Sequence, residues 1–236
     1  MNILAFDSSA IAASACIMHD REIISESFLQ AGLTHSQTLL PAIEGVLTSV
    51  KMSMSDIDYV AITVGPGSFT GVKISVSTAK GLAFPRNLPC ISISSLEALA
   101  YNLSAVDGII CPVMDARRQQ LYTAVFENNS NIITRKTKDS QLLFDELIDE
   151  LKIYDKVHLT GDGAKIFYGY CTEKNVNNVI LPPENLFLCR AGNVAQAALK
   201  HMDSAQDSHL IQPLYLRPPQ AERERLEKLN QSNQSK

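Results

Sequence analysis

Hydrophobic residues in the first hundred positions fall into short continuous runs and into longer stretches with helical spacing. The runs "NILAFD", "AASACIM" and "DYVAITV" have the length and composition of strands. A turn of small residues separates the first two, and "REIISESFL" follows the second after another short turn, which predicts neighbouring antiparallel strands. The beginning of the chain is therefore predicted to form a sheet.

An amphipathic helix is predicted over residues 36–50. Its apolar positions recur at steps of three and four and form one face: Leu39, Ile43, Val46 and Leu47. Just before this stretch, Thr34 and Ser36 are suitable N-cap residues, with His35 between them.

A second helix is predicted over residues 70–84 and a shorter one over residues 95–103. The second helix has small side chains at steps of four: Gly71, Ser75 and Ala79. Such a face allows close approach by another backbone, either the protein's own sheet or a second protein.

The order of elements restarts near residue 107. "GIICPVMDARRQQLYTAVFE" repeats the strand, turn and returning strand of "NILAFDSSAIAASACIM", and "KVHLTGDGAKIFYGY" repeats the strand, glycine turn and helix of "YVAITVGPGSFTGVKIS". This repetition predicts two related α/β lobes. The expected division is an N-terminal lobe at 1–105 and a C-terminal lobe at 106–210. An extended segment with a short helix at 211–229 is expected to pack back on the first lobe, and 230–236 to be a disordered tail.

Composition narrows the function classes. The 236 residues are 45% hydrophobic and 19% charged, with a formal charge of −4, which is ordinary for a globular protein. The sequence has no basic stripe, so this chain alone is not expected to bind nucleic acid tightly. No apolar run is long enough to span a bilayer, and the N-terminus lacks the features of a signal peptide, so we expect a cytoplasmic protein. The five cysteines and five histidines show no metal-ligand spacing, which predicts reduced thiols and no metal site.

The stretch "VGPGSFTGVKIS" places three glycines between a predicted strand and a predicted helix. It is neither GxGxxG nor a P-loop, since no GK[ST] follows. Two interpretations remain open: a tight corner, or an anion site at the helix N-terminus. The residues of such a vestigial nucleotide or anion site would be Asp7, Ser8, Gly67 and Ser68.

A pair of arginines, Arg117 and Arg118, lies in the predicted turn of "DARRQQLY". The simplest interpretation is a solvated turn in which one arginine pairs with Asp115. The alternative is a contact with a partner's acidic patch or with RNA phosphate.

Six segments, taken in order, resemble one known family: "LAFDSS", "HSQTLLPAIEGVL", "VGPGSFTGVKISVSTAKGLA", "ISSLEALA", "MDARRQQLY" and "PLYLRPP". They are similar to the bacterial TsaB family, also called YeaZ, over nearly the whole chain. The resemblance implies the α/β actin-like ATPase fold (ASKHA, RNase H-like), with two related lobes, each with a mixed sheet and flanking helices.

The same resemblance implies a non-catalytic scaffold. Its partner would be TsaD, the transferase that forms N6-threonylcarbamoyladenosine (t6A) at position 37 of tRNAs reading ANN codons, and TsaE, an ATPase, would join the assembly. ATP and metal are then expected on these partner subunits, no cofactor on this chain, and tRNA would be reached only through the complex. The metal-binding H-x-x-x-H pair of TsaD corresponds here to Ser95 and Leu99, which are poor metal ligands.

The family's partner surface is formed by its first two helices. On this chain the expected interface residues are His35, Leu39, Ile43, Val46, Leu47, Gly71, Ser75 and Ala79. The same helices could also pair two copies of the chain. Two enzymatic alternatives remain: an independent ATP-dependent, kinase-like enzyme of the same fold, and a metallopeptidase.

Overall fold

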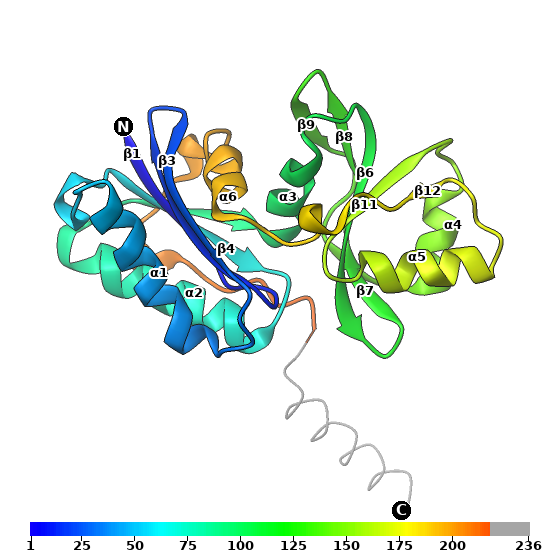
Figure 1. Cartoon of the computed structure of the whole chain (residues 1–236), viewed down its shortest axis with the longest axis horizontal. Coiled ribbons are helices and arrows are strands. Elements are labelled where there is room, and N and C mark those ends of the chain that lie inside the picture. The colour runs from blue at the N-terminus through cyan, green and yellow to red at the C-terminus, as the bar shows by residue number, and fades with distance from the viewer. Residues whose placement is uncertain (218–236) are drawn as a thin grey trace, which may run out of the picture.

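The structure, a computed structural model, describes residues 1–217 and consists of two lobes side by side (Figure 1). The first lobe contains a five-stranded sheet in the order β3-β2-β1-β4-β5. Its elements are β1 (Asn2–Asp7), β2 (Ala13–His19), β3 (Glu22–Leu29), α1 (His35–Ser49), β4 (Tyr59–Gly65), α2 (Phe69–Ala83), β5 (Cys90–Ser94) and α3 (Ser95–Ala100).

The second lobe repeats this topology. Its path β10-β7-β6-β11-β12 has the same order of antiparallel and parallel neighbours, and the extra strands β8 and β9 form a hairpin beside β6. The elements are β6 (Gly108–Arg117), β7 (Gln120–Thr123), β8 (Phe126–Asn129), β9 (Ile132–Arg135), β10 (Ser140–Leu143), α4 (Phe144–Leu151), β11 (Val157–Thr160), α5 (Ala164–Glu173) and β12 (Val179–Ile180). The helix α6 (Ala191–Ala198) follows them in the chain. The predicted pair of related lobes is confirmed.

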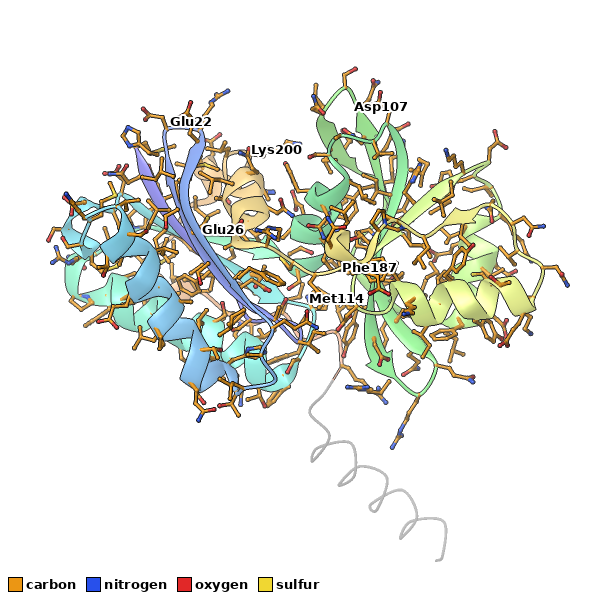
Figure 2. All side chains as sticks on the ribbon, viewed as in Figure 1. Glu22, Glu26, Asp107, Met114, Phe187 and Lys200 are labelled. Carbon is orange, nitrogen blue, oxygen red and sulfur yellow. The ribbon has the colours of Figure 1, made fainter. Side chains whose placement is uncertain are left out.

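Three apolar cores hold these layers together. One lies between the first sheet and the helices α1 and α2, and another between the second sheet and α4 and α5. The third lies between the lobes, where β1 and β5 of the first sheet, α3 and α6 meet β6 and β8 of the second. Met114 belongs to this central core and lies near the junction of the lobes (Figure 2).

The last part of the chain returns to the first lobe, which differs from the division expected from the sequence. α6 packs on β1 and β2, although residues 106–210 were assigned to the second lobe. Glu26 of β3 fixes this return, because its carboxylate accepts hydrogen bonds from the Arg190 guanidinium (2.7 Å) and from the N–H of Gly192 (2.9 Å).

Residues 211–217 continue along the first lobe. Ile211 is buried in its core, the N–H of Leu214 donates to the carbonyl of Val64 (2.7 Å), and the ring of Tyr215 lies 4.7 Å from that of Phe69. The predicted helix up to residue 229 and the tail at 230–236 lie outside the described residues. No helix within residues 1–217 is long and apolar enough to cross a membrane.

Candidate functional site

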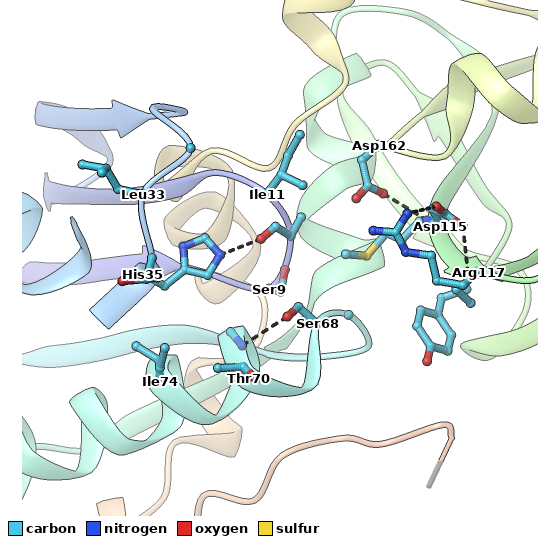
Figure 3. A pocket seen from close by; sticks show the side chains of 18 of the residues that line it. Ser9, Ile11, Leu33, His35, Ser68, Thr70, Ile74, Asp115, Arg117 and Asp162 are labelled. Atoms are coloured by element: carbon cyan, nitrogen blue, oxygen red, sulfur yellow. Dashed lines mark hydrogen bonds and ion pairs between the residues drawn. The ribbon is translucent and has the colours of Figure 1, made fainter. Parts of the chain in front are cut away.

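A cleft of about 680 Å³ lies between the lobes. One wall comes from the end of β1 and the starts of α1 and α2, with Ser9, His35, Ser68 and Thr70 (Figure 3). The opposite wall comes from β6, β7 and the turn before α5, with Asp115, Arg117, Tyr122 and Asp162.

The glycine turn forms a tight corner on the first wall. A Cβ at Gly67 would lie 2.2 Å from the carbonyl oxygen of Ser9, and a Cβ at Gly71 would lie 2.0 Å from that of Ser8. The N–H of Ser68 already donates to the Ser9 carbonyl (2.7 Å), so it does not point freely at a ligand. Glycine is therefore required because two backbones touch here.

Asp7, predicted to be part of an anion site, is sealed inside the first lobe. It is 1% exposed and does not line the cleft. One carboxylate oxygen accepts hydrogen bonds from the Thr63 hydroxyl and from the N–H of Ser9 (3.0 Å), while the other, Oδ2, has no partner within the described chain. Burial raises the pKa of Asp7, which favours the neutral acid.

Only half of the predicted anion site faces the cleft. Ser8 is fully buried, and its hydroxyl donates to the carbonyl of Gly71 (2.9 Å). Gly67 and Ser68 do line the cleft. The expectation that all four residues share one site is wrong for Asp7 and Ser8, because the turn packs over them.

The opposite wall has mixed charge. The Arg117 guanidinium donates to Asp115 (3.1 Å), and the N–H of Asp115 donates to Asp162 (3.1 Å). Burial raises the pKa of Asp162, and the neighbouring carboxylate of Asp115 raises it further. Two acids beside one arginine do not form a strong phosphate site, since like charges repel the ligand. Asp162 was not among the site residues predicted from the sequence. The feature that could have indicated it is the repeated pattern of strand, glycine turn and helix in which it lies.

His35 belongs to the cleft as well as to the start of α1. Its Nε2 lies 2.7 Å from the carbonyl oxygen of Ala10, and its Nδ1 is buried without a partner among residues 1–217. The sequence placed His35 at a partner interface; the residue lines this cleft (Figure 3) and also a second hollow between α1 and α2.

The other predicted interface residues face the protein's own sheet. They are all at most 9% exposed: Leu39, Ile43, Val46, Leu47, Gly71, Ser75 and Ala79. As an outward surface this prediction is wrong for all of them but Leu39, which also lines the hollow between α1 and α2. The apolar stripe that identifies α1 in the sequence packs into the core, and the small residues of α2 are buried as well.

The outward faces of α1 and α2 form a groove of about 510 Å³. Leu40 of α1 is 53% exposed beside it, and Phe69, Lys73, Ile74 and Ser77 of α2 line its other side. The Lys73 ammonium lies 4.2 Å from the centre of the Phe69 ring. An exposed leucine in a groove between two helices is typical of a docking surface for another helix.

Ser95 and Leu99 lie in α3 and are at most 2% exposed. Glu97 lies between them in the sequence, and its carboxylate pairs with His201 (2.9 Å) and Arg135 (3.4 Å). Within residues 1–217, no three histidine, cysteine or acidic side chains are grouped as metal ligands.

Comparison with known proteins agrees with this architecture. A family model for TsaD, tRNA N6-adenosine threonylcarbamoyltransferase, matches residues 29–225. The tRNA threonylcarbamoyladenosine biosynthesis protein TsaB of Bacillus subtilis is 31% identical over 94% of this chain and 96% of its own. The protein of the same name from Haemophilus influenzae is 29% identical over 92% and 94%.

The chain belongs to the TsaB (YeaZ) family. Among solved structures, YeaZ from Pseudomonas aeruginosa has a TM-score of 0.80 at 23% identity and covers 91% of this chain and 99% of its own. ROK hexokinase from Thermus thermophilus has a TM-score of 0.50 at 11% identity, covering 86% and 100%. These likenesses confirm that this TsaB-family chain has the actin-like ATPase fold.

Proposed function

We propose that this chain is a non-catalytic scaffold subunit for t6A formation, which binds TsaD and supports its transferase activity on tRNA. Family membership supports the role in t6A biosynthesis, because its relatives carry that name. The single structural observation that supports docking is the groove between α1 and α2, with Leu40 exposed beside it. TsaE would join the resulting assembly, and ATP and metal would bind to the partner subunits.

Two further observations favour a scaffold over a transferase. The positions that match the TsaD histidine pair hold Ser95 and Leu99, and both are buried. A catalytic metal must also contact the substrate, which enters from solution. Because Ser95 and Leu99 are buried, neither side chain could bind such a metal unless the central core opened.

The kinase-like alternative has less support. In kinases built from two such lobes, an acid at the position of Asp7 has to reach a metal–phosphate group in the cleft. Here the Asp7 side chain is buried and does not line the cleft. The opposite wall presents Asp115 and Asp162. Calorimetric titration of the chain with ATP and magnesium tests this alternative, which predicts saturable heat, whereas the scaffold proposal predicts none.

Variants of the outward face test the proposal directly. Leu40→Glu and Ser77→Arg place charges in the groove without touching the core, since Leu40 and Ser77 are exposed. We expect each variant to weaken binding of co-expressed TsaD roughly tenfold or more, because the charge would be desolvated in the interface. Thermal unfolding should be unchanged, and addition of the variants should restore less t6A formation than the original chain.

Ile153→Glu is the matched control, because Ile153 is 78% exposed after α4 of the other lobe. It should co-purify with TsaD like the original chain. Normal affinity of both groove variants would contradict the proposed docking surface. Full t6A formation by TsaD and TsaE without this chain would contradict the scaffold role.

A further inference from the structure

The turn between β6 and β7 holds two arginines in an unfavourable backbone conformation. Arg117, Arg118 and Gln119 all have positive φ, at 65°, 56° and 56°. Arg117 pairs with Gln120, so Arg118 and Gln119 form a two-residue hairpin turn. Such turns strongly favour Asn-Gly, because a Cβ is disfavoured in left-handed backbone. The hairpin alone would therefore be more stable with other residues.

Three arginines lie in or against this turn. Arg117 bonds to Asp115, yet its side chain is 83% exposed. Arg118 is exposed and has no hydrogen bond or ion pair in the described part of the chain. Arg217 arrives from the C-terminal segment and donates to the carbonyl of Ala116 (3.0 Å). Two separate segments thus bring arginines to one edge of the second lobe.

A hollow of about 470 Å³ beside the turn extends this surface along α5. Lys165 lines it and pairs with Glu184 at 2.9 Å, but both side chains are more than 70% exposed, so the pair is weak. Glu173 and Asp115 also line the hollow, and Asp115 is paired with Arg117. Within residues 1–217, Arg118 and Arg217 form no ion pair with a carboxylate.

We propose that Arg118 at the tip of this turn, with Arg217 and the adjoining hollow, contacts the phosphate backbone of RNA, while Arg117 stays paired with Asp115. The guanidinium fork matches phosphate oxygens, and a fixed turn presents it in one direction. The inference rests on the proposed function, which brings tRNA to the assembly. Because the whole chain carries a formal charge of −4, the contact orients tRNA already held by the complex and does not supply the main affinity.

The double variant Arg118→Asn with Gln119→Gly tests this contact without weakening the fold. It installs the favoured Asn-Gly turn, so the thermal midpoint should stay the same or rise while the guanidinium is lost. In the assembled complex, we expect tRNA affinity to fall roughly three- to tenfold, and the slope of log affinity against log salt to fall by about one. Affinity for the partner protein should be unchanged.

Arg21→Gly is the control, because it removes one exposed arginine from another two-residue hairpin turn, between β2 and β3 of the first lobe. Its tRNA affinity and salt slope should equal those of the original chain. Equal affinity and slope for the Asn-Gly variant would overturn the inference, as would a loss confined to partner binding, which would indicate an acidic protein surface.

The inference and the proposed function fail in different ways. If the original chain does not join TsaD, the proposed function fails. The same variants are then compared in tRNA binding by the isolated chain at low salt, where a difference specific to residues 118–119 supports the phosphate contact and its absence overturns it.

Discussion

Gly71 lies in the first turn of α2, directly over the end of β1. The atom closest to a Cβ added at Gly71 would be the backbone oxygen of Ser8, and a backbone atom cannot rotate away as a side chain could. The glycine spacing of the sequence correctly indicated a special turn. The spacing could not distinguish a corner from an anion site, because the deciding contact is made by Ser8 and Ser9, more than fifty positions earlier.

The first prediction compares two glycines of the same helix. Gly71→Ala places a Cβ 2.0 Å from the Ser8 oxygen, and we expect a loss of more than about 2 kcal/mol in the free energy of unfolding. At Gly81, by contrast, nothing lies within 4 Å of the added Cβ, and Gly81→Ala should stabilise the protein by about 0.5–1 kcal/mol. Urea unfolding of both variants measures the difference, and equal stabilities would contradict a tight corner.

At the scale of secondary structure, apolar periodicity predicted α1 and α2 within one residue at each end. It did not distinguish the outward residues of these helices from the rest. An apolar stripe that is buried is the stronger signal in a sequence, so exposed positions such as Leu40 and Ser77 do not stand out in it. The return of α6 to the first sheet was also missed, since "AGNVAQAA" is short and rich in alanine and fits either lobe.

The Glu26 carboxylate gives the element-scale prediction, because it joins β3 to the start of α6. Glu26→Ala removes its bonds to Arg190 and to the N–H of Gly192, and should lower the free energy of unfolding by about 1–3 kcal/mol. Amide exchange should accelerate first in α6. Glu22→Ala is the control at the exposed start of the same strand (Figure 2) and should change stability by less than about 0.5 kcal/mol. Uniform acceleration across both lobes would contradict a local role for Glu26.

At the scale of the whole molecule, the sequence predicted the duplication, because strand, turn and helix recur in the same order. It could not show how the lobes meet. That contact depends on residues of both halves that come together only in the folded chain, such as Ile93 of β5 and Phe126 of β8 in the central core. The cleft wall with Asp115 and Asp162 depends in the same way on distant positions.

The central core leads to the last prediction, which concerns cooperativity. Because apolar residues of both lobes share one core and α6 returns to the first sheet, neither lobe can lose its structure without exposing the other's buried surface. Scanning calorimetry should therefore show a single transition, with equal calorimetric and van't Hoff enthalpies.

Phe126→Ala, at a residue 1% exposed, should lower the free energy of unfolding by about 3–5 kcal/mol and move this one transition to lower temperature. Ile132→Ala, at a residue 61% exposed, should leave the transition nearly in place. Two separate transitions in the original chain would show that the lobes unfold independently and that the shared core contributes little to their union.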